Sequence, residues 1–126
     1  MGTFSVDIQI RAAGTTANSA TPTKGLVDTG AAFSQFPASL LTSLGVIADR
    51  MVPTVLADGT RGECRAGWAE VSYQDRRAFT LVLFGAETSL ALLGAHVLEG
   101  LGLAVDPVRR VLEPTRVPLA LINFDR

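Results

Sequence analysis

Hydrophobic and polar residues alternate most regularly near the start of the chain. In FSVDIQIR, residues 4–11, apolar residues occupy one side and polar residues, ending with Arg11, occupy the other. This repeat of two predicts a strand with one buried face. The next stretch, AAGTTANSATPT (residues 12–23), is small and polar with glycine and proline, which predicts a loop. A short buried strand, GLV at 25–27, should follow and deliver Asp28.

The spacing becomes helical after Phe36. PASLLTSLG (residues 37–45) begins with a proline suited to a first helical turn, spaces its leucines along one face and ends at Gly45, so we expect one short helix. Residues 51–57 and 60–73 then predict two strands. The residues between them contain Asp58-Gly59, a strong hairpin signal.

The second half of the chain predicts more short elements. A turn near Gln74 leads into a strand, RAFTLVLF (77–84), and the apolar run SLALLG (89–94) is expected to be fully buried. AHVLEGLG predicts a second short helix that ends at Gly100 or Gly102. LAVDP and RRVLEP predict a strand, a turn and another strand before the apolar tail VPLALINF (117–124). Many short strands with brief helices predict a mostly β protein, closed or sandwich-like.

Length and composition narrow the class of protein. The 126 residues suit a single domain, 1–126, and 48% hydrophobic with 18% charged residues suits a folded one. The net charge of −1 and the isolated arginine pairs argue against nucleic acid as a partner. No stretch approaches the roughly 20 apolar residues of a membrane span, and we expect no export signal. One cysteine, Cys64, excludes an intrachain disulfide and favours the cytoplasm.

Most familiar catalytic and ligand-binding patterns are missing from the sequence. His96 is the single histidine and has no ligand cluster around it, so we expect no metal and no cofactor. A thiol nucleophile at Cys64 would have only that histidine as its base, which favours a half-buried strand residue instead. GLGLAV lacks the third glycine of a dinucleotide fingerprint. We assign Trp68 and Phe79 to the core or to a groove wall.

Asp28 is the residue that needs an explanation. It stands between Val27 and a Thr-Gly turn, where an ionised carboxylate needs hydrogen-bond donors or a function. A structural explanation is available, because aspartate often starts a turn by accepting backbone N–H groups two residues on. In that case the protein would be a β-barrel module in which Asp28 only braces the chain.

The surrounding residues resemble a known family. LVDTGA (26–31) resembles the active-site signature of the aspartic proteases, in particular the retroviral-type (retropepsin-like) ones and their bacterial relatives. ALLGAHVLEGLGL (91–103) resembles the family's apolar-apolar-glycine element and the short helix after it, through Leu92, Leu93 and Gly94. The hairpin lies between the two motifs, where the family carries its flap. The likeness covers roughly residues 4–113 and implies a closed β-barrel of the retropepsin type with one or two short helices.

The resemblance also implies an activity, that of an aspartic endopeptidase. In this chemistry one ionised carboxylate takes a proton from water while a second, protonated carboxyl polarises the scissile carbonyl. Two carboxyls about 3 Å apart cannot both ionise, so they share a proton. The chain has one Asp-Thr-Gly motif, and the resemblance therefore implies a homodimer in which each copy supplies its Asp28.

The remaining site residues follow from the same resemblance. Thr29 is expected to hydrogen-bond across the dimer axis, and Gly30 and Ala31 to complete the active-site loop. The flap residues would fold over a peptide or protein substrate: Ala57, Asp58, Gly59 and Thr60. LADGTRGE is poorer in glycine and apolar residues than retroviral flaps, so Asp58 and Arg61 would alter its contact with a peptide.

Other interpretations stay open from the sequence. The same fold could serve a peptide-binding or interaction domain that does not hydrolyse its ligand. The tail, RVPLALINFDR, could form a strand at the dimer interface or lie along its own subunit's sheet. Neither the substrate nor the cleavage specificity can be read from these residues, and neither can an origin in a longer precursor.

Overall fold

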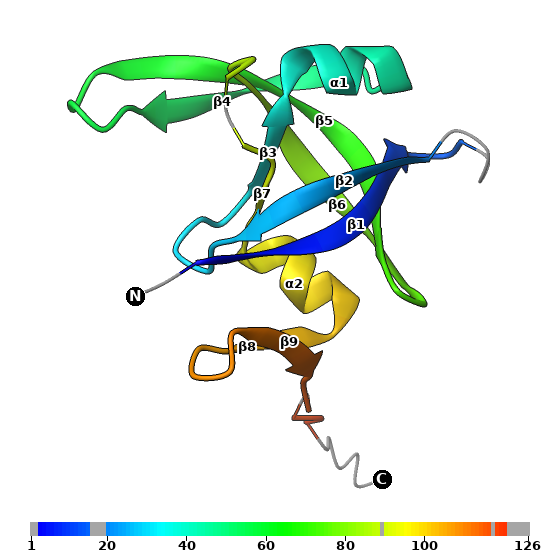
Figure 1. The fold of residues 1–126 in the computed structure, drawn as a ribbon. Coiled ribbons are helices and arrows are strands. Elements are labelled where there is room, and N and C mark those ends of the chain that lie inside the picture. Colours follow the sequence, from blue (N-terminus) through cyan, green and yellow to red (C-terminus); the bar gives the residue numbers. More distant parts are fainter. Residues whose placement is uncertain (1–2, 16–19, 89, 117, 121–126) are drawn as a thin grey trace, which may run out of the picture.

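The computed structural model describes residues 3–15, 20–88, 90–116 and 118–120. Two helices lie among the strands, α1 (Ala38–Leu44) and α2 (Ala95–Leu101) (Figure 1). The strands are β1 (Phe4–Ala12), β2 (Thr21–Val27), β3 (Ser34–Pro37), β4 (Ala48–Val55), β5 (Arg61–Tyr73), β6 (Arg76–Gly85), β7 (Leu92–Leu93), β8 (Leu103–Asp106) and β9 (Val111–Pro114).

Most of the strands close into a barrel. Neighbours pair in the order β1-β2-β7-β3-β6-β5, and a further pairing of β1 with β5 closes the ring. β4 pairs with the end of β5 that leaves the ring, so these two strands project as a long hairpin (Figure 1). β8 and β9 form a separate two-stranded sheet below α2. The predicted mostly β, closed barrel with two short helices is confirmed.

Two strand predictions need correction. The expected loop at 12–23 ends early, because β2 begins at Thr21 and pairs with β1 from Thr21 opposite Ile10 to Val27 opposite Phe4. β3 was not expected, since four residues are too few for a pattern; it runs parallel to β6 and antiparallel to β7. In both cases the hydrogen bonds of the pairing partner, rather than local composition, create the strand.

Glycine ends both helices as predicted. Gly45 and Gly102 have positive φ angles of 87° and 72°, the left-handed conformation that commonly follows a last helical turn. α2 therefore ends at the second of its two candidate glycines. α1 begins one residue later than expected, because Pro37 still belongs to β3 and precedes the first turn.

The barrel is filled by aliphatic and aromatic side chains. Fully buried members include Ile10, Phe36, Leu41, Leu93 and Val97, so both helices contribute to the same core. Apolar burial of this kind is the main favourable term in folding.

Leu90 lies further outside than the sequence suggested, and Trp68 and Phe79, assigned to the core or to a groove wall, lie at the surface. Leu90 is 70% exposed, so the run 89–94 is not fully buried; its later residues enter the barrel, where Ala91 joins the core and β7 pairs with β2 and β3. Trp68 is 43% exposed, with the guanidinium of Arg50 5.7 Å from its ring centroid. Phe79 is also exposed and lines a surface hollow, in agreement with the groove wall that the sequence left open.

A charged pair is buried where the alternation of β1 predicted exposure. Arg11 lies opposite Glu70 of β5 in the sheet, and both residues are less than 9% exposed. Arg11 Nη1 lies 3.8 Å from Glu70 Oε1, and the exposed Arg77 approaches the other carboxylate oxygen at 3.5 Å. Closure of the barrel thus covers Arg11, and the paired carboxylate compensates its charge.

The carboxylate of Glu87 accepts hydrogen bonds from the start of α1. The backbone N–H of Ser39 donates to Glu87 Oε2 at 2.9 Å and the Ser39 hydroxyl donates to Glu87 Oε1. These hydrogen bonds, the hydroxyl's first, lower the pKa of Glu87. The folded protein therefore holds this proton less tightly than the unfolded chain. The resulting stabilisation is present above the unfolded pKa and is lost as pH falls through the lowered one.

Glu87→Gln is expected to lower the melting temperature at neutral pH by a small amount, because the site is exposed to solvent. The difference from wild type should vanish in acid, where both side chains are neutral. Thermal unfolding followed by circular dichroism at about pH 7 and about pH 3 measures it. Glu63→Gln, an exposed change on β5, is the control. An equal difference in melting temperature at both pH values would show that the ionised carboxylate of Glu87 is not the source of the stabilisation.

Candidate active site

Asp28 follows β2 directly and is held by three hydrogen bonds. Its N–H donates to the carbonyl of Leu93 at 3.0 Å, and its own carbonyl accepts the N–H of Ala31 at 3.2 Å. Its carboxylate oxygen Oδ1 accepts the N–H of Gly30 at 3.0 Å. The residue is half-buried, whereas Thr29 and Gly30 are exposed. The turn that the sequence allowed is therefore present, and it orients the carboxylate.

β7 lies beside β2 and supports this loop. The two strands run parallel, with Leu26 opposite Leu92 and Val27 opposite Leu93, and Leu26 donates its N–H to Ala91 at 2.8 Å. The structure thus brings the segment Leu92–Gly94 directly against the strand that ends at Asp28.

The first turn of α2 clamps the residues after the motif. The N–H of Ala95 donates to the carbonyl of Ala31 at 2.7 Å, and that of His96 donates to the carbonyl of Ala32 at 3.1 Å. The first N–H groups of a helix have no partner within the helix. Here the loop carbonyls satisfy two of them, which fixes the loop and the helix relative to each other.

Gly94 permits this close approach. A Cβ atom at this position would lie 2.7 Å from the carbonyl oxygen of Phe33 and 2.8 Å from that of Ala31. Both contacts are with backbone atoms, which cannot rotate away as a flexible side chain can. Gly94, the glycine of the apolar-apolar-glycine element, is therefore required because a residue with a Cβ atom would collide with the backbone here.

Ser34 is a site residue that the sequence analysis missed. Its side chain is fully buried, and its hydroxyl oxygen accepts the N–H of Gly94 at 3.1 Å across 60 residues of sequence. Serine is common on protein surfaces, so nothing in the local pattern distinguishes this one. Only its place in the unpredicted strand β3 brings it to Gly94.

Ser34→Ala is expected to lower the free energy of unfolding by about 1–3 kcal/mol, because it leaves the buried N–H of Gly94 without an acceptor. Urea unfolding, followed by circular dichroism, measures the change. Ser5→Ala, at an exposed position of β1, provides the same chemical change without burial. Equal midpoints for the two variants would show that the buried hydrogen bond contributes nothing.

The structure gives His96 and Cys64 packing and hydrogen-bonding roles. His96 lies at the start of α2 with its ring stacked on Phe33, 5.3 Å between centroids, so it packs against the loop that α2 supports. Cys64 is half-buried on β5 and its thiol donates to the Phe84 carbonyl at 3.2 Å, which confirms the strand assignment. Among the described residues, no three His, Cys, Asp or Glu side chains gather as metal ligands would. No helix in the described part of the chain is long and apolar enough to cross a membrane.

The tip of the β4–β5 hairpin consists of the residues between Val55 and Arg61. Leu56 donates its N–H to the carbonyl of Thr60 at 2.8 Å, and Gly59 has a positive φ of 86°, as the tight turn requires. The side chain and the N–H of Thr60, in this order, donate to Asp58 and lower the pKa of its carboxyl. Asp58 therefore stays ionised further into acid than an ordinary aspartate.

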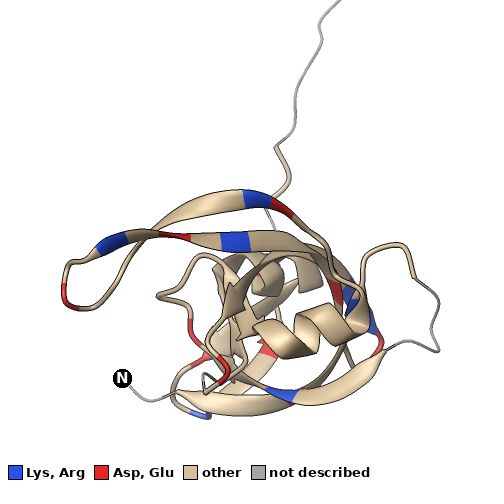
Figure 2. Cartoon of the chain, turned by 90° about the horizontal axis from the view of Figure 1, so that it is seen from above, with Lys and Arg blue, Asp and Glu red and all other residues tan. Residues whose placement is uncertain are grey.

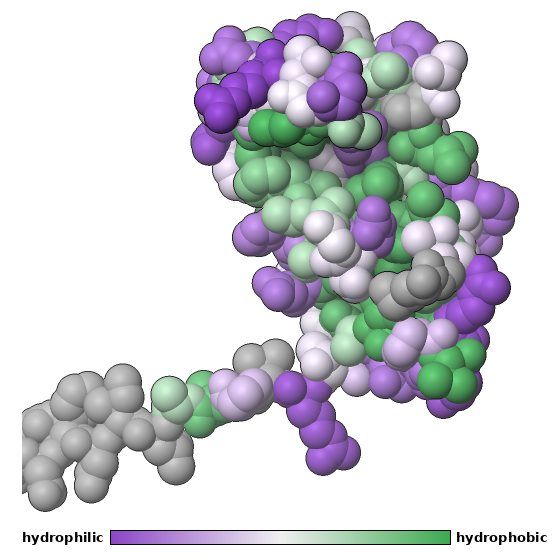
Figure 3. Space-filling model, turned by 90° about the vertical axis from the view of Figure 1, so that its left-hand side faces the viewer, coloured by the Kyte–Doolittle hydropathy of each residue, from purple (hydrophilic) through white to green (hydrophobic). Residues whose placement is uncertain are grey.

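The hairpin and the Asp28 loop lie on the same side of the molecule, the left in Figure 1. Seen from above, acidic and basic residues are interspersed along the hairpin (Figure 2). Figure 3 views this side directly and shows hydrophobic surface below the polar hairpin. The hollow that Asp28 lines has only about 30 Å³, and its other residues include Phe4, Thr29 and Pro107. The described residues of one chain thus leave Asp28 on an open face.

Comparisons with known proteins support the fold. No protein-family model matches the sequence, and no curated protein matches it. The structure is similar to that of EIAV protease complexed with the inhibitor HBY-793, with a TM-score of 0.57 and 21% identity over 80% of this chain and 89% of that one. It is also similar to the protease of simian foamy virus (mac), with a TM-score of 0.53 and 16% identity over 75% of this chain and 92% of that one. The chain has the retropepsin-like fold of these retroviral proteases.

Proposed function

We propose that the protein is an aspartic endopeptidase that acts as a homodimer, with Asp28 of each copy as the catalytic residue. The observation that carries this proposal is the setting of Asp28. Its half-buried carboxylate is oriented by Gly30 on a loop clamped by β7 and α2, within a retropepsin-like fold. A residue that merely braced a turn would not need supports from two distant segments.

The proposed chemistry uses the two carboxyl groups in different states. The ionised one takes a proton from water as the water oxygen bonds to the peptide carbonyl carbon, and the protonated one gives its proton to the carbonyl oxygen. The tetrahedral intermediate then collapses: a proton passes to the amide nitrogen and the C–N bond breaks. Asp28 Oδ1 accepts the N–H of Gly30, which orients the carboxylate and still leaves lone pairs on both oxygens for proton transfer.

A second copy is required because the chain contains one Asp-Thr-Gly motif. Thr29 and Gly30 are exposed next to Asp28, which leaves room for an equivalent loop to approach across a two-fold axis. Thr29 would hydrogen-bond to the opposite loop, and Ala31 would hold its own loop through the N–H of Ala95. The segment Leu92–Gly94 supports the arrangement from behind.

The hairpin tip would cover the substrate. Residues Ala57–Thr60 lie on the same side as Asp28, and an extended peptide between them could pair its main chain with the hairpin. The exposed charges of Asp58 and Arg61 would then face the peptide or the opposite tip. This gives the flap a more polar character than a glycine-rich one.

Cleavage of a diverse peptide library, read by mass spectrometry between about pH 3 and about pH 8, tests the proposal. A dyad that shares one proton predicts a bell-shaped dependence of kcat/KM on pH, because activity needs one carboxyl in each state. An Asp28→Asn preparation purified in the same way reveals any contaminating protease. Absence of cuts by a dimeric wild-type protein that binds library peptides would favour the non-hydrolysing binding domain instead.

A further inference from the structure

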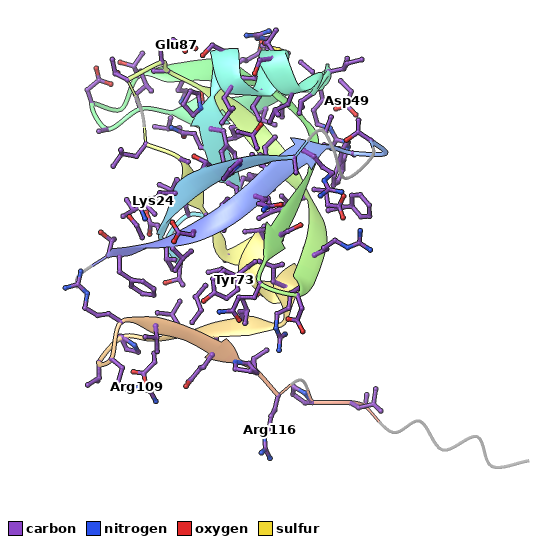
Figure 4. All side chains as sticks on the ribbon, turned by 45° about the vertical axis from the view of Figure 1, so that its right-hand side comes forward. Lys24, Asp49, Tyr73, Glu87, Arg109 and Arg116 are labelled. Carbon is purple, nitrogen blue, oxygen red and sulfur yellow. The ribbon has the colours of Figure 1, made fainter. Side chains whose placement is uncertain are left out.

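The outer hollow, a space of about 490 Å³ beside Phe79, lies on the outside of the barrel. Its lining comes from the turn after β1 and from β5 and β6: Gly14, Thr15, Glu70, Arg77 and Phe79. Figure 4 shows the β5–β6 hairpin from this side, with Tyr73 labelled at its end. Spaces of about 300–1000 Å³ are typical of sites for small ligands, so the outer hollow is large enough for one.

The register of the sheet places the side chains of the outer hollow on one face. Glu70 lies opposite Arg11 of β1 on one side and opposite Phe79 of β6 on the other. Their neighbours along the strands, Ala69 and Ala78, belong to the core. Because successive side chains of a strand point to opposite faces, Glu70 and Phe79 point out of the barrel.

Arg77 lies on the same face and has unused hydrogen-bond donors. It stands two residues before Phe79 on β6 and so shares its side of the sheet. Within the described part of the chain its guanidinium makes one ion pair, from Nη1 to Glu70 Oε2 at 3.5 Å, and its side chain is 68% exposed. A guanidinium carries five N–H donors, and a fork of two of them fits a carboxylate. Donors of Arg77 therefore remain for an anion that arrives from outside.

The charged side chains at the outer hollow carry an excess of positive charge. Arg11 approaches Glu70 Oε1 at 3.8 Å while Arg77 approaches Oε2, so two guanidinium groups face one carboxylate. Arg11 and Glu70 are buried, and charges withdrawn from water interact more strongly than exposed ones. The remaining positive charge favours an anion over a cation as the occupant.

Phe79 adds an apolar surface beside this charge. It is 63% exposed. The exposed ring of Trp68 has the guanidinium of Arg50 at 5.7 Å from its centroid, whereas none of the described rings or guanidinium groups covers the ring of Phe79. An uncovered ring next to a guanidinium suits a ligand that is apolar at one end and negatively charged at the other.

From these features we propose that the outer hollow binds a carboxylate attached to an aromatic or large apolar group. The guanidinium of Arg77 holds the carboxylate, and the ring of Phe79 packs against the apolar part. A free aromatic acid offers this chemistry, and so does the C-terminal residue of a peptide. The site is independent of the proposed proteolysis, because the described residues that line it are not those that hold the Asp28 loop.

Titration of the isotope-labelled full chain with phenylacetate, followed by two-dimensional NMR, tests the site. The backbone N–H signals of Thr15, Arg77 and Phe79 should shift in a saturable way, with a Kd in the millimolar range expected for so small a ligand. Phenylacetamide, which has the same shape without the charge, should bind at least about tenfold more weakly. Equal binding of acid and amide, or no saturable shift at these residues, would overturn the proposal.

Variants separate the contributions of the guanidinium and the ring. Arg77→Gln and Phe79→Ala should each weaken phenylacetate binding at least about fivefold. Arg109→Gln is the matched control, because the side chain of Arg109 is 70% exposed and also pairs with a carboxylate, that of Asp106, outside the outer hollow. An Arg77→Gln protein that is folded by circular dichroism and binds phenylacetate as wild type does would overturn the assignment. The comparison of acid and amide uses wild type alone, so it decides the question even where a substitution disturbs folding.

A further titration distinguishes the two sources of the carboxylate. N-acetyl-glycyl-phenylalanine presents the same group at the end of a peptide, and its C-terminal amide is the control. Binding at least about tenfold tighter than that of phenylacetate would assign the outer hollow to a peptide C-terminus. Equal or weaker binding of the peptide, with phenylacetate bound, would assign it to a free acid.

Discussion

Asp28→Asn is expected to reduce kcat/KM by at least about 10³-fold, since it removes the group that takes and returns the proton. Asparagine keeps the shape of the side chain and its oxygen can still accept the N–H of Gly30. The variant should therefore unfold at the same urea concentration as wild type. Asp75→Asn, an exposed turn residue, should retain full activity.

Mixed dimers make this prediction specific for a shared dyad. When equal amounts of wild-type and Asp28→Asn chains are unfolded and refolded together, random pairing leaves about a quarter of the dimers with two aspartates. Activity should fall to about that fraction of an all-wild-type sample, instead of the half expected if each chain acted alone. Activity of about one half would show that a single Asp28 suffices.

Gly94→Ala is expected to lower the free energy of unfolding by about 1–3 kcal/mol, because the new methyl group would collide with backbone carbonyls. The carbonyls of Ala31 and Phe33 would have to move, and Ala31 belongs to the loop that positions Asp28. Activity should consequently fall by more than the loss of folded protein explains. Urea unfolding and peptide cleavage, measured on the same sample, separate the two effects.

Gly62→Ala is the matched control for this change. A Cβ atom at Gly62 would meet only the Thr54 hydroxyl at 3.8 Å, an ordinary contact. Alanine also restricts the unfolded chain more than glycine does, so this variant should be slightly more stable than wild type. If both glycine variants unfolded at the wild-type urea midpoint, the close packing of Gly94 against the loop would make no contribution to stability.

The parts of the fold that the sequence predicted correctly are those that depend on residues close together in the chain. The strand predicted from the alternation of 4–11, the Asp58-Gly59 turn and the two helices with their terminal glycines are all present. Each depends on residues a few positions apart, whose spacing or φ preference is visible in the sequence. The same holds for Asp28, because a charge between an apolar strand and a glycine turn is unusual wherever the strand goes. The catalytic role of that residue remains a proposal.

Features that depend on distant segments could not be predicted from spacing. Ser34 looks like any surface serine until β3 places it against Gly94. Arg11 occupies a polar position in the alternation of its strand, yet the pairing of β1 with β5 places it beside Glu70 and buries both residues. Leu90 belongs to an apolar run but stays exposed, because the run joins the core from Ala91 onward.

The sequence by itself determined the strands with a clear alternation, the helix ends and the candidate residue Asp28. The tertiary structure alone decided which segments support that residue, which charges are buried, and that a groove opens between α2 and the β8–β9 hairpin. The physical reason is that periodicity and turn preference are properties of neighbouring residues, whereas burial and hydrogen-bond partners are set when the barrel closes and joins strands far apart in the chain.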